Sequence, residues 1–184
     1  MRTRETALPG VVTITFPGHA DARGTFSRLW CAEAFAAAGI AFAPTQCSLS
    51  TNIAAHTLRG LHWQAPPLAE SKLVRCLRGR LFDVAVDLRA GSPTFGCWTA
   101  AELLPQGEAL FIPAGCAHGF LTLEPDTEVL YLIDAPYVAE AARGMAWNDP
   151  DIAVTWPASP AVVGDRDAAL PTFAALLAAG DLPC

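Results

Sequence analysis

The sequence predicts a mainly β domain, built as a sandwich or a barrel of short strands. Fifteen prolines and fourteen glycines interrupt the 184 residues at short intervals, and the runs between them are rich in Val, Leu, Ile, Phe and Thr. Such runs, bounded by turn residues, are typical of strands joined by tight connections. With 52% hydrophobic and 16% charged residues, the chain can bury one large core. This composition excludes a disordered tail, a coiled coil and a disulfide-stapled mini-protein.

The clearest strands lie on either side of Gly79. Residues 72–78 and 80–88 are rich in strand-forming residues, and apolar and polar side chains alternate from Phe82 to Arg89. We expect these two strands to form a hairpin with one apolar and one polar face. Further strands are expected, in chain order, at residues 11–16, 25–30, 45–50, 57–63, 98–103, 109–112, 118–122 and 128–133.

Helices are sparse in this pattern. One is expected at residues 31–38, where Gly39 ends it, and a second at residues 172–179, where Gly180 ends it, because glycine is the usual residue after a helix C-terminus. The sequence contains no internal repeat or linker, so residues 1–184 are interpreted as one domain. Within it, residues 158–184 are expected to be helical or irregular and to pack on the barrel.

Charge and targeting features narrow the classes of partner. The net charge of −6 and the pI near 5.1 disfavour nucleic acid and anionic membranes as partners. Any phosphate-bearing ligand must then be held by a few local Arg or Lys side chains. The N-terminal residues lack the apolar segment of a signal peptide, and the charge-free run at residues 34–58 is too polar to span a bilayer. We therefore expect a cytoplasmic protein.

The six cysteines are separated by long gaps and form no C-x-x-C motif, so they predict neither a disulfide framework nor a zinc knuckle. We interpret them as small buried hydrophobic residues of a protein in a reducing compartment. They are Cys31, Cys47, Cys76, Cys97, Cys116 and Cys184.

Polar side chains on strands that should face the interior indicate a pocket. The interior of a small barrel is normally filled by apolar side chains, and any one polar residue there could simply lie at a strand end. Several together favour a lined ligand pocket. The candidates are Arg59, His62, Lys72, Asp83, His118 and Tyr131. Among them, Lys72 is the only lysine of the chain, an indication that arginine would not serve there.

Gly107, Pro113, Gly115 and His118 fit the second cupin motif, G-x5-P-x-G-x2-H. The first cupin motif should supply H-x-H followed by a glutamate, but this chain has only His62 at that place, followed by Trp and Gln. One imidazole from that strand leaves too few ligands for a transition metal. We therefore expect no metal, which leaves the histidines available for acid–base chemistry.

Six segments, in order along the chain, closely resemble the dTDP-4-dehydrorhamnose 3,5-epimerase family. They are ADARGTFSR from Ala20, TLRGLHWQAPP from Thr57, KLVRCLRGRLFDVAVDLRAGSPTFG from Lys72, IPAGCAHGFLTL from Ile112, TEVLY from Thr127 and WNDPDIAVTWP from Trp147. The resemblance implies a jelly-roll cupin that forms a homodimer and uses neither metal nor cofactor. It also implies an isomerase of dTDP-rhamnose biosynthesis, which epimerises a nucleotide-diphosphate-linked 4-keto-6-deoxyhexose at carbons 3 and 5.

The same resemblance assigns roles to individual residues. It implies that His62 is the general base, with Asp167 as its carboxylate partner, that Lys72 stabilises the enolate oxygen and that Tyr131 returns a proton from the opposite face. Two arginines are implied to bind the diphosphate, and five further residues match pocket positions. The arginines are Arg23 and Arg59, and the pocket residues are Phe26, Gln46, Asp83, His118 and Tyr137.

General chemistry agrees with these roles. Removal of a proton beside a ketone gives an enolate, and a buried cation near the oxygen stabilises the charge that develops there. Inversion of the carbon requires a base on one face and an acid on the other, and histidine and tyrosine suit these two tasks.

Three competing functions stay open at this point. The first is a single-centre epimerase acting on a related dTDP- or CDP-linked 4-keto-deoxysugar. This alternative stays open because the chain departs from the usual family pattern at two positions. Gly164 stands where a serine is common, and His56 stands where a glycine is common. The second is a non-catalytic sugar-binding cupin, which the joint presence of base, acid and lysine disfavours. The third is a metal-dependent cupin dioxygenase, which the missing H-x-H motif disfavours.

Overall fold

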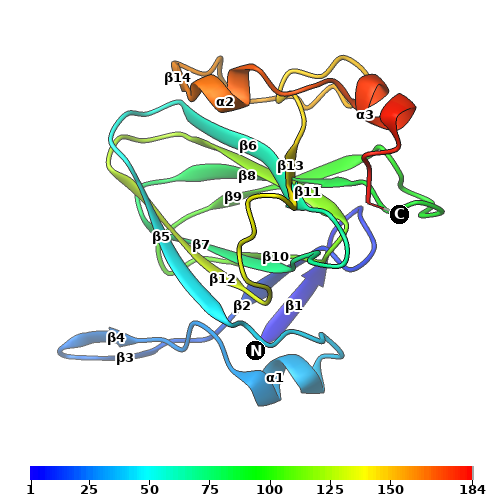
Figure 1. Ribbon diagram of the computed structural model, residues 1–184. Helices are drawn as coiled ribbons and strands as arrows, with labels where there is room; N and C mark the ends of the chain where they lie inside the picture. Colours follow the sequence, from blue (N-terminus) through cyan, green and yellow to red (C-terminus); the bar gives the residue numbers. More distant parts are fainter. Residues whose placement is uncertain (184) are drawn as a thin grey trace.

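The computed structural model describes residues 1–183 and contains two six-stranded sheets packed face to face (Figure 1). Sheet I has the order β1 (Arg2–Glu5), β2 (Val12–Thr15), β10 (Ala109–Ile112), β7 (Lys72–Arg78), β12 (Thr127–Ile133) and β5 (Gln46–Asn52). Sheet II has the order β13 (Ala142–Gly144), β6 (Thr57–Gln64), β11 (Cys116–Thr122), β8 (Leu81–Asp87) and β9 (Trp98–Leu103), and the short β14 (Val162–Val163) pairs in parallel with β6. The predicted mainly β sandwich is confirmed.

The inner faces of the two sheets share one apolar core. Val74 and Leu110 of sheet I meet Leu81 and Phe120 of sheet II, and all four side chains are almost fully buried. Burial of such side chains is the main stabilising contribution to a sandwich of this kind. The polar residues of the site lie where this apolar filling stops, between β6, β7, β11 and β12.

The predicted hairpin around Gly79 is wrong. Strand β7 belongs to sheet I and β8 belongs to sheet II, so the chain crosses from one sheet to the other at this glycine. Gly79 has a φ of +76°, and a Cβ atom there would lie 2.3 Å from Thr127 Oγ1. The turn was therefore recognisable from the sequence, but the pairing partners depend on long-range contacts.

The predicted polar face of β8 is likewise not a solvent face. Asp83 and Asp87 point to the inside of the sandwich and are fully buried, whereas Val84 and Val86 lie on the outer face of sheet II. That outer face is also covered. The alternation in the sequence identified two faces correctly, but both are buried because a second layer packs on each.

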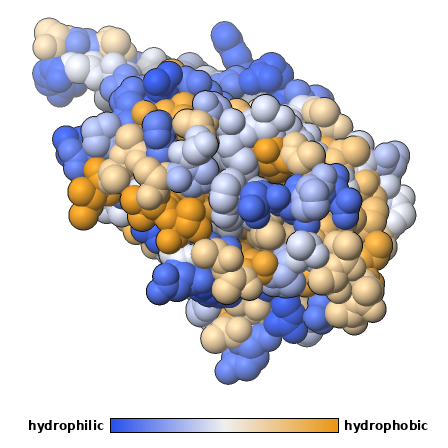
Figure 2. All heavy atoms as spheres, turned by 90° about the horizontal axis from the view of Figure 1, so that it is seen from above, coloured by the Kyte–Doolittle hydropathy of each residue, from blue (hydrophilic) through white to orange (hydrophobic). Residues whose placement is uncertain are grey.

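The layer on the outer face of sheet II is the C-terminal segment, which contains α2 (Asp165–Ala168) and α3 (Phe173–Ala179) (Figure 1). Leu176 of α3 and Ile152 pack against Trp63 and Val86. Helix α3 begins after Thr172, whose hydroxyl accepts a hydrogen bond from the Ala175 amide, and ends at Gly180 with a φ of +72°. Seen from above, this cover carries hydrophilic and hydrophobic residues intermixed (Figure 2).

The N-terminal region supplies a second small core and a projecting arm. Helix α1 (Ala32–Ala37) buries Phe35 against Phe16, Phe42 and Phe111 on the outer side of sheet I. Before it, β3 (His19–Asp21) and β4 (Gly24–Phe26) form a two-stranded hairpin, which we call the arm, and it extends away from both sheets (Figure 1). The strand expected at residues 25–30 is therefore wrong beyond residue 26.

Four short strands were not expected from the sequence, namely β1, β3, β13 and β14, and α2 was expected only as part of a helical or irregular segment at residues 158–184. Each has four residues or fewer, too few for a periodic pattern to be distinguished from a loop. Within residues 1–183, no helix is long and apolar enough to cross a membrane.

The cysteines follow the prediction only in part. Cys76 and Cys116 are buried, and burial raises the pKa of the two thiols to about 11 and about 12. Cys47 and Cys97, however, are exposed, because their positions on an edge strand and in a connecting loop leave them uncovered. Cys184 lies outside the described residues.

Candidate active site

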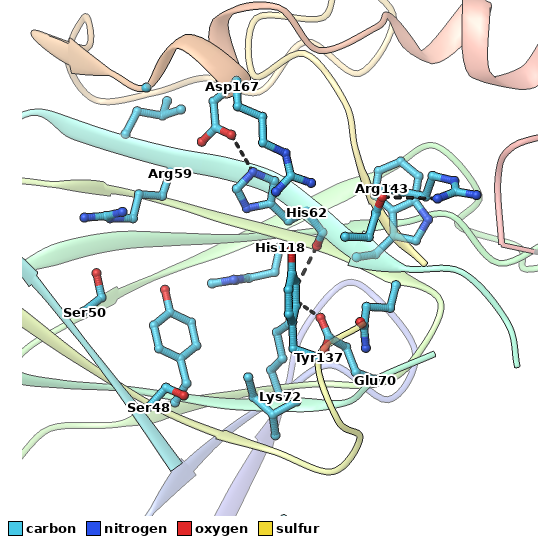
Figure 3. Close-up of a pocket in the computed structure, with 18 of the residues that line it drawn as sticks. Ser48, Ser50, Arg59, His62, Glu70, Lys72, His118, Tyr137, Arg143 and Asp167 are labelled. Atoms are coloured by element: carbon cyan, nitrogen blue, oxygen red, sulfur yellow. Dashed lines mark hydrogen bonds and ion pairs between the residues drawn. The ribbon is translucent and has the colours of Figure 1, made fainter. Parts of the chain in front are cut away.

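A cavity of about 600 Å³ opens between the two sheets beside the C-terminal segment. Sheet I contributes residues of β5, β7 and β12 to its wall, and sheet II contributes residues of β6 and β11. Most residues that the sequence nominated line this cavity together (Figure 3). They are Arg59, His62, Lys72, His118, Tyr131, Tyr137 and Asp167.

The local structure of β6 explains how Arg59 and His62 reach the same cavity. In a regular strand, residues three apart point to opposite faces. Here the register between β6 and β11 shifts, because Arg59 lies opposite Phe120 while His62 lies opposite His118. Between them, Gly60 has a φ of +136°, and a Cβ atom at this position would lie 2.5 Å from Gly119 Cα. This bulge therefore requires glycine.

His62 and Asp167 form the central polar pair of the cavity. His62 Nε2 lies 2.7 Å from Asp167 Oδ1, and the Gly60 amide donates to Asp167 Oδ2 at 3.0 Å. Burial alone would raise the pKa of Asp167, but the hydrogen bonds from His62 and Gly60 outweigh it and hold the pKa below its ordinary value. The carboxylate thus stays ionised and can only accept, so in a neutral imidazole Nε2–H donates to Asp167 and the lone pair lies on Nδ1.

Lys72 brings a buried cation to the same space. Its ammonium lies 2.9 Å from Glu70 Oε1 and 3.4 Å from the carbonyl oxygen of His62. The lysine side chain is only 10% exposed. A cation in such surroundings interacts strongly with any negative charge that forms nearby.

A second histidine–aspartate pair lies deeper, beside Tyr131. His118 Nε2 lies 2.7 Å from Asp83 Oδ1, and the rings of His118 and Tyr131 meet edge to face with centroids 5.7 Å apart. Complete burial raises the pKa of Asp83 despite its contact with His118. Burial, together with the charge of Asp83, raises the pKa of Tyr131 well above its ordinary value. The phenol is therefore held protonated, as a proton donor must be before it acts.

Three arginines supply the positive charge that an anionic ligand requires. Arg59 is held by a hydrogen bond from its Nε to Asn52 Oδ1 at 2.9 Å. The Asn52 amide nitrogen in turn donates to the carbonyl oxygens of Thr127 and Ser50. Arg143 and Arg166 line the same cavity, so local cations are present even though the whole chain is acidic.

The structure does not bring four nominated residues to the cavity wall of their own chain. Asp83 lies behind His118 and contacts the cavity through it. Gln46 shares the face of Ser48 and Ser50 on β5 but lies beyond the cavity. Arg23 and Phe26 lie on the exposed arm, where Arg23 pairs with Asp21 at 2.6 Å and Phe26 is 79% exposed.

The sequence did not nominate several polar or charged residues of the cavity wall, among them Ser48, Glu70, Arg143 and Arg166. Ser48, Glu70 and Arg166 each lie within two positions of a nominated residue, and this proximity was the available signal. Arg143 had none, because it lies in a segment where no strand was expected.

A metal centre was not expected from the sequence, so the question is whether side chains that could bind a metal lie together in the structure. Within residues 1–183 there is no cluster of three or more His, Cys, Asp and Glu side chains suited to a metal ion. Both His62 and His118 use Nε2 in a contact with a carboxylate. The absence of a metal stays a prediction.

Comparison with known proteins agrees with this geometry. A family model described as dTDP-4-dehydrorhamnose 3,5-epimerase matches residues 5–175. A protein of that name from Sinorhizobium fredii is 46% identical over 160 residues, which cover 85% of this chain and 81% of the relative. A dTDP-4-dehydrorhamnose 3-epimerase from Streptomyces niveus is 35% identical and is matched over 100% of this chain and 89% of its own length.

Solved structures show the same fold. The Legionella pneumophila dTDP-6-deoxy-D-glucose-3,5-epimerase, solved in complex with dTDP-4-keto-L-rhamnose, superposes with a TM-score of 0.92. It is 33% identical in sequence, and the match covers 99% of this chain and 97% of that one. Together with the family match and the arrangement of His62, Asp167, Lys72 and Tyr131, these similarities show that the chain belongs to the dTDP-4-dehydrorhamnose 3,5-epimerase family.

Proposed function

We propose that this protein epimerises dTDP-4-dehydro-6-deoxyglucose at carbons 3 and 5 to give dTDP-4-dehydrorhamnose. The observation that carries this function is the placement of a base, a cation and an acid around one cavity. His62 with Asp167, Lys72 and Tyr131 all line it. The family match and the 46% identical relative of the same activity support the proposal.

In the proposed reaction, His62 Nδ1 removes the proton beside the C4 ketone. The electron pair of the broken C–H bond forms the enolate double bond, and the carbonyl oxygen takes up the negative charge. Lys72 stabilises this oxygen electrostatically. Tyr131 then donates its phenolic proton to the carbon from the opposite face, and the resulting phenolate and the protonated His62 are restored by exchange with solvent. No group outside the protein and water is needed to balance the reaction.

The nucleotide diphosphate is assigned to the arginines of the cavity. Arg59, held in place by Asn52, is the principal anchor, because bidentate guanidinium contacts suit phosphate oxygens. Tyr137, 60% exposed at the cavity mouth, offers a flat ring to the nucleobase or sugar. Arg59→Ala is expected to weaken substrate binding more than it slows turnover.

The arm supports a homodimer as the working form. All six residues of β3 and β4 are exposed, and the hairpin makes no sheet with the body of its own chain. We propose that the arm of one subunit reaches the cavity of its partner, where Arg23 and Phe26 complete the substrate site. This arrangement accounts for residues that the family resemblance nominates but the single chain leaves far from its own cavity.

The proposed location is the cytoplasm. The five cysteines within residues 1–183 are free thiols, which suits a reducing compartment.

The test is incubation of the purified enzyme with dTDP-4-dehydro-6-deoxyglucose in deuterated water, with the labelled carbons located by NMR. Deuterium at both carbons 3 and 5 is the expected result. A single-centre 3-epimerase is the second candidate, favoured by the relative from Streptomyces niveus, and it would label carbon 3 alone. The CDP-linked sugar, run in parallel, reports on the nucleobase. Binding without any exchange would contradict both epimerases and favour a sugar-binding module.

A further inference from the structure

Glu70 is a carboxylate in the cavity to which the reaction assigns no task. It lies in the connection between β6 and β7 and lines the cavity with Lys72. Of the two carboxylates in the cavity wall, Asp167 is engaged by His62. A second negative charge close to the place where a diphosphate binds and an enolate forms is unfavourable by itself. Its presence therefore indicates another task within the site.

The contacts of Glu70 point to Lys72. Glu70 Oε1 lies 2.9 Å from Lys72 Nζ, and the two side chains are 9% and 10% exposed, respectively. An ion pair so deeply buried is shielded from solvent and interacts far more strongly than an exposed pair. Without the carboxylate, the ammonium would be a buried charge with no counterion.

The hydrogen-bonding capacity of the ammonium gives the pair a geometric role. Lys72 Nζ carries three N–H donors. One is directed to Glu70 at 2.9 Å and a second to the carbonyl oxygen of His62 at 3.4 Å, which leaves one donor for an oxygen in the cavity. The second contact also ties the lysine head to the backbone of the residue that carries the base (Figure 3).

We propose that Glu70 is a positioning residue that holds the Lys72 ammonium in place to meet the enolate oxygen. This inference rests on the proposed epimerase function and adds to it a residue that acts through Lys72 and not on the substrate. The site then contains two matched pairs in its wall. Asp167 orients the base His62, and Glu70 orients Lys72, the cation that stabilises the enolate.

The first test is the kinetics of Glu70→Ala and Glu70→Gln. In the proposed mechanism Lys72 acts on the enolate, which forms only in the chemical step. Glu70→Ala is therefore expected to lower kcat by about 10- to 100-fold and to change KM by less than about 3-fold. Glu70→Gln keeps an oxygen that accepts from Lys72 and is expected to recover most of the lost rate. Glu102→Ala, which breaks an exposed ion pair with Arg80, is the control and should match the wild type.

The second test is a double-mutant cycle with Lys72→Ala. If Glu70 acts through Lys72, adding Glu70→Ala to Lys72→Ala should change the rate of deuterium exchange by less than about 2-fold. A further 10-fold loss in that background would overturn the proposal, because Glu70 would then act on the substrate itself. Full activity of Glu70→Ala would overturn it as well.

A thermal-unfolding cycle on the same four proteins tests the pair without substrate. Non-additive changes in Tm are expected, since each single variant leaves a buried charge alone. Additive changes would show that the two groups do not interact and would contradict the inference even if the wild type exchanged no deuterium. An inactive wild type with non-additive Tm values would instead contradict the proposed function, and with it the catalytic task of the pair, while confirming that Glu70 and Lys72 interact.

Discussion

Gly60 shows how one residue decides which side chains reach the cavity. Its φ of +136° and its close approach to Gly119 allow the bulge that turns Arg59 and His62 to the same side. A Cβ atom at this position would lie 2.5 Å from Gly119 Cα, so a side chain would force β6 away from β11. The shared orientation of the proposed diphosphate anchor and the proposed base therefore depends on a residue that has no functional group.

Tyr131→Phe separates the two proton transfers. If His62 is the base and Tyr131 the acid, the variant can still form the enolate and take a proton back on the original face. Exchange of substrate protons with solvent deuterium should therefore persist while net epimerisation falls by roughly 100-fold or more. Both rates follow from one NMR time course. His62→Ala should lose both activities, and wild-type epimerisation by Tyr131→Phe would show that another group is the acid.

Asp83→Asn tests the buried pair through the pH dependence of stability. Because burial raises the pKa of Asp83, the unfolded chain releases this proton at a lower pH than the folded protein does, and stability falls as pH rises from the unfolded-state pKa to the folded-state pKa. Asparagine does not titrate, so the Tm of the variant relative to wild type should increase as pH rises above about 4, the ordinary pKa of an aspartate. Thermal unfolding across that range measures this difference. A difference that decreased with pH would contradict a raised pKa.

Two elements outside the two large sheets differ in how they relate to the site. The C-terminal segment delivers Asp167 from α2 to His62 on β6, and α3 anchors that segment by burying Leu176 against sheet II. The arm, in contrast, contributes no residue to the catalytic cavity of its own chain. The C-terminal segment is thus positioned by packing within the subunit, whereas the role proposed for the arm requires a partner subunit.

Leu176→Ala and Leu177→Ala form a matched pair of variants on α3. Leu176 is 4% exposed and Leu177 is 56% exposed. The first change leaves a cavity under the C-terminal segment and should lower the free energy of unfolding by about 2–4 kcal/mol. The second should change it by less than about 0.5 kcal/mol. Urea unfolding measures both, and equal effects would show that α3 does not anchor the segment as described.

At the scale of the whole molecule, the proposed dimer makes each site a product of two chains. Complementation tests this directly. Arg23→Ala and His62→Ala homodimers should each be impaired, but a mixed dimer contains one cavity with an intact base and an intact partner arm. After denaturation and refolding together, a one-to-one mixture should recover about a quarter of wild-type activity at low substrate concentration. No recovery in a mixture shown to contain mixed dimers would place the arm on its own chain's site.

Metal removal is a second whole-molecule prediction. Both interior histidines, His62 and His118, contact a carboxylate through Nε2, so this nitrogen is not free to bind a metal. Activity should therefore survive exhaustive dialysis against a chelator. Elemental analysis before and after dialysis is the measurement, and loss of about one transition metal per chain together with activity would contradict the mechanism.

The sequence by itself determined the fold class, the cupin turn before His118 and the identity of the main candidate catalytic residues. It could do so because turn residues, strand composition and short motifs act locally, and because the segments around Thr57, Lys72 and Thr127 are specific to one family. Position 70 lies outside those motifs, between the segment that ends at Pro67 and the segment that begins at Lys72. Nothing in the pattern therefore marked Glu70 as part of the site.

Only the tertiary structure decided which strands pair, which faces are buried and which side chains meet. The turn at Gly79 joins two different sheets, Asp83 and Asp87 lie inside the sandwich, and His62 meets Asp167 across 105 positions of the chain. These outcomes depend on long-range packing, where one register shift or one covering segment reverses the environment of a residue. Arg23 and Phe26 lie on the exposed arm, away from the cavity of their own chain, so the role proposed for them depends on contacts between subunits.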